Sequence, residues 1–278
     1  MTLLVFFAVL GAALLHASWN AIVKTGASKQ SAMLVLTVGH GLIGAVIVAF
    51  HPLPPAHVWP WLMASGMIHT TYQLLLASAY EQGDLSRVYP LARGAAPLLV
   101  LVAGSVLLTD HITGPEMAGI TLLGLGIVLM ARGIFRHGES RRMLPFALGS
   151  AVATAAYSLV DGTGARLSGN VVSYVGWLMI ASAVFFVPVL LTLRGHQVLR
   201  IPRRGLAWGA LASVMSYLAY AIAVWAMTQA PIALVTALRE TSILFAVLIG
   251  WIVFGERMDR QKAIASGLIL TGVIITRL

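Results

Sequence analysis

The sequence predicts an all-α membrane protein with ten transmembrane helices. Of its 278 residues, 59% are hydrophobic and only 10% are charged, and the mean hydropathy is +0.91. This composition leaves too little polar surface for a water-soluble globule. A membrane-spanning helix needs about 20 apolar residues, so ten fit the chain with short connections. The 27 glycines lie inside long apolar runs, which argues against a β-barrel.

Charged residues, prolines and histidines divide the chain into ten apolar segments. In chain order we expect helices over residues 2–24, 31–50, 57–80, 85–108, 113–132, 143–164, 170–193, 205–228, 232–254 and 260–277. The first segment is too long for the core of a signal peptide and has no basic residues before it, so we interpret it as a spanning helix. In the fourth segment, Pro97 removes a backbone hydrogen bond and predicts a kink near Arg93.

The formal net charge of +9 would suggest nucleic-acid binding in a soluble protein. Here the basic residues lie mainly in the connections, where they orient the chain in the membrane, and we expect no nucleic-acid partner. The chain has no cysteine and no helical HExxH motif, so we expect neither a metal site nor another cofactor. It also has no phosphate-binding GxxxxGK[ST] loop.

Two halves of similar length suggest an internal repeat. The basic connection from Arg132 to Arg142 divides the chain into residues 1–135 and 143–278, with five expected helices in each. An offset of 146 residues pairs Arg93 with Arg239, Gly104 with Gly250, Asp110 with Glu256, and Gly126 with Gly272. The two arginines matter most, because charges inside membrane helices are rare. Copies with an odd number of helices face opposite ways, so we predict inverted repeats, as in many secondary transporters.

Several short motifs carry a family resemblance. His16-Ala17-Ser18-Trp19-Asn20 is followed by Lys24, and Gly255-Glu256-Arg257 separates the last two segments. In this order and spacing the chain resembles the drug/metabolite transporter superfamily, in particular its EamA-type members. The resemblance implies a secondary active transporter, not an enzyme, that exports a small polar or amphipathic metabolite. The first half departs from the pattern with Thr109-Asp110-His111, so the two copies are functionally unequal.

The basic residues also bear on orientation. Excluding Arg93 and Arg239, 14 of the remaining 16 lysines and arginines lie on one side of the predicted helices, and only Arg166 and Arg277 lie on the other. The positive-inside rule then places both termini outside the cytoplasm, whereas the family resemblance implies termini inside. We slightly favour the orientation that the charge count indicates. We expect a multi-pass protein of the cell's inner membrane.

Polar residues inside the first and third helices are candidate substrate ligands. His16, Asn20 and Lys24 are four residues apart and share one face of the first helix, with Trp19 beside them. His69 and Gln73 repeat this spacing in the third helix, next to Tyr72. A cavity histidine could take part in proton coupling. The alternative for each is a hydrogen bond that joins neighbouring helices.

The fourth and ninth helices supply the strongest charges. Arg93 and Arg239 suit a carboxylate or phosphate, and Glu240 is a candidate proton carrier. Adjacent helix residues point about 100° apart, so Arg239 and Glu240 cannot neutralise each other face to face. The alternative is a structural ion-pair network. We expect Asp161 at the rim of the sixth helix, where it would be solvated.

These residues predict a chamber near the bilayer midplane, lined by the first, third, fourth, sixth, eighth and ninth helices. Tyr157 and Tyr220 add aromatic surface for a cation. An amino-acid-like zwitterion would satisfy both the arginines and the acidic and aromatic groups. We expect a small-molecule substrate, membrane lipids, and a proton or counter-substrate as partners. The competing functions are a flippase for lipid-linked substrates and an intramembrane enzyme, although no nucleophile and base pattern supports the enzyme.

Overall fold

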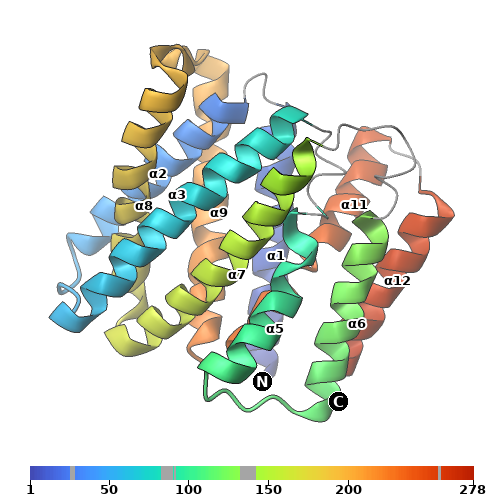
Figure 1. Cartoon of the computed structure of the whole chain (residues 1–278). Coiled ribbons are helices and arrows are strands. Elements are labelled where there is room, and N and C mark those ends of the chain that lie inside the picture. The colour runs from blue at the N-terminus through green and yellow to red at the C-terminus, as the bar shows by residue number, and fades with distance from the viewer. Residues whose placement is uncertain (26–28, 83–89, 91, 132–141, 256–257) are drawn as a thin grey trace.

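The computed structural model describes residues 1–25, 29–82, 90, 92–131, 142–255 and 258–278, and these ranges form a bundle of helices without strands (Figure 1). The first half contains α1 (Leu3–Thr25), α2 (Lys29–Val48), α3 (Trp59–Gln82), α5 (Ala96–Leu107) and α6 (Gly114–Ala131). The second half contains α7 (Met143–Ser168), α8 (Val171–Arg194), α9 (Arg203–Met227), α10 (Ile232–Arg239), α11 (Ser242–Phe254) and α12 (Arg260–Ile275). Short 3₁₀ turns, η1 (Ala56–Val58) and η3 (His196–Leu199), precede α3 and α9.

The bundle has the surface of a membrane protein. Six helical segments are long and apolar enough to cross a bilayer, namely Leu3–Val23, Lys29–Val48, Met143–Ser168, Val171–Arg194, Arg203–Met227 and Ile232–Val253. Large apolar side chains such as Leu42, Val106 and Ile252 point outward from their helices and are exposed. Such a surface is unfavourable in water and favourable against lipid tails. The chain is therefore a multi-pass membrane protein.

The helix ends lie close to the predicted segments, with three differences. The fourth and ninth segments are interrupted, as described below, and α7 continues to Ser168 instead of ending at residue 164. Gly162 and Gly164 lie within this longer helix, where a Cβ would collide with Ile232 of α10 and with the ring of Tyr174 of α8. These glycines therefore permit α8 and α10 to pack closely against α7. The predicted repeat boundary at residues 132–141, the pair Glu256-Arg257 and the side chain of Lys24 lie outside what the structure describes.

Helix packing follows an approximately two-fold pattern. The helix α2 packs against α8, and α6 packs against α12, so that equivalent helices of the two halves meet. The contact of α1 with α9 corresponds to that of α7 with α3, and the contact of α1 with α11 corresponds to that of α7 with α5. The two halves are therefore interleaved, and both termini lie at the same end of the bundle (Figure 1). The short helix α10 lies at the centre, where all eight of its residues are buried.

Candidate functional site

The site is built around a break in the ninth predicted segment. The backbone N–H groups of Glu240 and Thr241 bond to carbonyl oxygens three residues back, at Ala237 (3.0 Å) and Leu238 (3.1 Å). The Thr241 hydroxyl also donates to the Leu238 carbonyl at 2.7 Å. Such tightened turns inside helices often mark functional hinges. The sequence did not predict the break, because no helix-breaking proline or glycine occurs between Ile232 and Ile249.

The first half has a corresponding interruption. Residues 92–94 are helical, Ala95 is the N-cap of α5, and Pro97 lies in the first turn of that helix. Proline fits a first helical turn, where its missing N–H is not needed. The predicted disturbance near Pro97 is therefore present, and both interruptions lie next to an arginine, Arg93 in one half and Arg239 in the other.

Arg93 and Glu240 form an ion pair between the two halves. The Arg93 Nε donates to one carboxylate oxygen of Glu240 at 2.9 Å, and Nη2 donates to the other at 2.6 Å. Their side chains are 1% and 0% exposed, so the pair is fully withdrawn from solvent. Bidentate geometry of this kind is the strongest form of charged hydrogen bond. As expected, Glu240 is not neutralised by its neighbour Arg239.

Among the described residues, Arg239 has no equivalent carboxylate partner. The repeat offset that pairs Arg93 with Arg239 places Gly94 at the position of Glu240. The Arg239 guanidinium lies over the ring of Tyr220, 5.2 Å from its centre. No acidic side chain among the described residues forms an ion pair with it, and its Nη1 is buried without a hydrogen-bond partner there. A buried, unpaired cation of this kind is costly unless water or an anion reaches it.

Arg239 faces a cavity in the middle of the bundle. The cavity contains about 540 Å³ of space not filled by protein atoms, part of it open to the surroundings. Only about 50 Å³ of this space can be occupied by the centre of a water molecule, which is enough for about four waters. Eight of the predicted site residues line it, namely His16, Trp19, His69, Tyr72, Gln73, Tyr157, Tyr220 and Arg239. A metabolite would therefore need the cavity to widen on binding.

The remaining predicted site residues lie elsewhere. Arg93 and Glu240 are occupied with each other, and the Asn20 side-chain amide donates to the His16 carbonyl at 2.8 Å. Sequence reasoning did not anticipate the other lining residues, which are Met33, Leu36, His40, Leu76, Met179, Ser182 and Ser216. Small polar or apolar residues within apolar segments carry no signal that separates a cavity wall from ordinary helix packing. For His40 we had expected helix packing.

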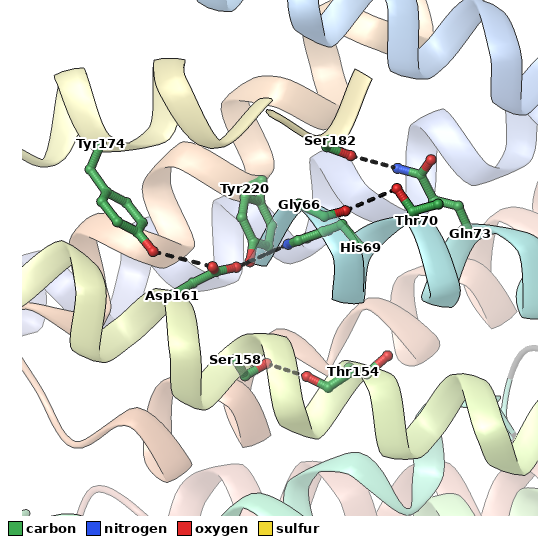
Figure 2. A network of polar contacts seen from close by, with 10 residues as sticks. All are labelled: Gly66, His69, Thr70, Gln73, Thr154, Ser158, Asp161, Tyr174, Ser182 and Tyr220. Atoms are coloured by element: carbon green, nitrogen blue, oxygen red, sulfur yellow. Dashed lines mark hydrogen bonds and ion pairs between the residues drawn. The ribbon is translucent and has the colours of Figure 1, made fainter. Parts of the chain in front are cut away.

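Asp161 organises a network of buried polar groups from four helices (Figure 2). This carboxylate of α7 is fully buried and lies 2.9 Å from the Nε2 of His69 on α3. It also accepts hydrogen bonds from the hydroxyl groups of Tyr220 on α9 and Tyr174 on α8. The His69 ring stacks on Tyr157, with their centres 4.3 Å apart. The prediction of a solvated Asp161 at the rim was wrong, because α7 extends a further turn beyond the expected end.

A second charged cluster closes the end of the bundle where the termini lie. Arg166 on α7 pairs with Asp110, in the connection between α5 and α6, at 2.6 and 3.1 Å. Arg166 also donates to the carbonyl groups of Met227 and Ala230, and Asp110 accepts from the backbone N–H of Ile232 at 2.8 Å. We call Asp110, Arg166 and these three backbone groups the clasp. It holds α7 against the start of α10.

The cavity lies near the middle of the helices that line it. Its lining residues on α2 and α3 reach towards the end where α1 leads into α2 and where α3 ends, whereas Met179 on α8 and Tyr220 on α9 lie in the helix halves nearest the clasp. At the end opposite the clasp, the partly exposed side chains of Glu81 and Arg194 form an ion pair between helices.

Comparisons with known proteins identify the family. The model of the EamA-like transporter family matches residues 3–132 and again residues 141–278, so the chain belongs to this family and contains two copies of its unit. A solved structure described only as "Crystal structure of protein" has the same fold, with a TM-score of 0.76 over 99% of this chain and 98% of that chain, at 21% identity. A search of curated proteins gives no significant match.

Proposed function

We propose that this member of the EamA-like transporter family is a secondary active transporter with ten membrane spans in two inverted five-helix repeats. It resides in the cell's inner membrane and exports a small polar or amphipathic metabolite by alternating access. The two-fold packing pattern and the doubled family match support the repeats. The short helices α10 and α11 together make one span, as expected for the discontinuous helices of transporters.

The guanidinium of Arg239, which forms no ion pair with a described residue, is the single observation that carries the substrate assignment. Transporters of inverted repeats bind their substrates near the midplane, beside broken helices, and Arg239 ends the first half of such a helix. Arginine recognises carboxylate and phosphate groups with paired hydrogen bonds. The substrate therefore carries an anionic group that Arg239 binds, and the apolar and aromatic wall contacts the rest of the molecule.

The clasp and the two central breaks support alternating access. The clasp joins α7 to the start of α10 at the end of the termini, and the cavity lies near the middle of the bundle. Movement about the breaks at Ala95 and Glu240 would open the clasp and close the cavity at the opposite end. Such hinge motions need only a few residues at element ends.

A transport assay with matched arginine variants tests the proposal. Purified protein in liposomes is presented with a panel of labelled carboxylates, amines and neutral compounds of amino-acid size. Anionic compounds should enter protein-dependently, Arg239→Ala should abolish their transport, and the exposed control Arg200→Ala should behave as the unmodified protein. Transport that survives in Arg239→Ala, or a preference for purely cationic compounds, would show that Arg239 does not bind the substrate.

A further inference from the structure

The network of His69, Asp161 and Tyr220 engages only one ring nitrogen of His69, a residue that lines the cavity. The carboxylate of Asp161 lies at the Nε2 of His69, which assigns the proton of the neutral ring to that nitrogen. The Nδ1 has no hydrogen-bond partner among the described residues, and His69 lines the cavity. A buried carboxylate that holds one ring nitrogen and leaves the other free is the arrangement that makes histidine a proton acceptor in enzymes.

The other groups around His69 are mostly uncharged. From α7 and α9 it faces Asp161, Tyr157 and Tyr220, and Tyr72 lies on its own helix. His40 on α2 and His16 on α1 line the same cavity, and Tyr174 on α8 reaches Asp161 from the far side. Asp161 is thus the only carboxylate described next to His69, and it would stabilise the ring after a second proton binds.

The anion-binding residue and this histidine share one tyrosine. The Tyr220 ring lies beneath the Arg239 guanidinium, and its hydroxyl group donates to Asp161 and lies 3.2 Å from the His69 Nε2. An anion that binds Arg239 therefore enters directly beside the proton-accepting histidine. Both residues line the same cavity, and away from bulk water charges that share a cavity affect each other strongly.

The sum of the buried charges sets the stoichiometry. Among the described residues the buried charged side chains are Arg93, Glu240, Arg239 and Asp161, and their formal charges cancel. A bound monoanion would leave the site with one negative charge, which is costly at membrane depth. One proton on the Nδ1 of His69 restores neutrality, and no other bond is made or broken.

We propose that His69 is the binding site for a coupling proton, which enters the cavity together with a monoanionic substrate bound by Arg239. The inference rests on the proposed transport function and defines its coupling ion and substrate charge. The bound site is electrically neutral, so that a proton and the anion cross together, and in export the outward gradient of the anion drives both. A zwitterionic substrate would need no such proton.

Proton uptake on anion binding tests this directly. The probe is methanesulfonate, a small permanent monoanion that cannot release or take up a proton itself, and its uncharged isostere dimethyl sulfone is the control. Isothermal titration calorimetry counts the protons taken up per anion. It is carried out in the cationic buffers Tris and imidazole, over a series from about pH 6 to 8 around the ordinary pKa of histidine. We expect uptake to approach one proton per methanesulfonate within this series, and no binding of dimethyl sulfone.

Two histidine variants separate the proton from the anion. His69→Gln should bind methanesulfonate more weakly and take up no proton, whereas His196→Gln, at an exposed position, should match the unmodified protein. Should His69→Gln fail to fold, Asp161→Asn should likewise reduce uptake, because the charged ring would lose its carboxylate. Anion binding without uptake in the unmodified protein would overturn the proton site and leave Arg239 as the anion ligand. Absence of methanesulfonate binding would overturn both.

Discussion

The ion pair between Arg93 and Glu240 should be a main source of stability. Replacing one member of a buried pair leaves the other charge uncompensated, which costs about 3–5 kcal/mol. Glu240 is fully buried and accepts two hydrogen bonds from Arg93, so Glu240→Gln should lower the free energy of unfolding by about 3 kcal/mol. The pair formed by Glu81 and Arg194 is the control, because its side chains are 33% and 39% exposed. Glu81→Gln should cost about 1 kcal/mol or less.

Reversible unfolding in mixed micelles of increasing SDS content, followed by tryptophan fluorescence, measures both losses. The double variant Arg93→Met/Glu240→Leu should be more stable than the sum of its single variants by about 2 kcal/mol, since it removes both buried charges. If Glu240→Gln costs no more than Glu81→Gln, the pair is not structural. Glu240 would then be free to act as the proton carrier that the sequence suggested.

Three further predictions concern symmetry, gating and orientation. Gly94→Glu should place a carboxylate beside Arg239 and abolish methanesulfonate binding by calorimetry, whereas Gly94→Ala, which introduces the same Cβ 2.8 Å from Ile127, should retain it. Asp110→Asn should weaken the clasp by about 1 kcal/mol and so speed thiol labelling of Ala230→Cys about fivefold, in a chain that has no other cysteine; an unchanged rate would show that the clasp is not a gate. A phosphatase reporter fused after Leu278 should be active, as the charge count requires, and an inactive reporter would place the termini in the cytoplasm.

The sequence predicted the helices well because their physical requirement is local. A run of about 20 apolar residues is sufficient to span the bilayer, and α2, α8 and α9 begin and end within two residues of the expected positions. The break at Glu240 was missed because Thr241 achieves it with a side-chain hydrogen bond that hydropathy does not register. A proline produces a recognisable break in sequence, but a threonine does not.

The sequence singled out residues of the cavity wall by their type. Charged and aromatic residues inside spans are unusual, which is why His69, Tyr220 and Arg239, which line the cavity, stood out. The partners of such residues could not be predicted, since Arg93 and Glu240 are 147 residues apart in the sequence and Asp161 and His69 are 92 residues apart. Burial and pairing depend on which helices touch, and a single sequence without that information left Glu240 as a proton carrier and Asp161 as a solvated rim residue.

Departure from two-fold symmetry creates the proposed binding site. In an exactly repeated chain, each half would supply an arginine and a carboxylate at the central breaks, and two crossed ion pairs would neutralise both arginines. Gly94 removes one carboxylate, so that Arg93 and Glu240 still tie the halves together while Arg239 turns to the cavity. In the proposed mechanism the same asymmetry extends to the proton, because Asp161 and His69 would supply the compensating charge on one side of Tyr220 only. The repeat would then provide the means of alternation, and a glycine in place of a glutamate would leave the charge that an anionic substrate recognises.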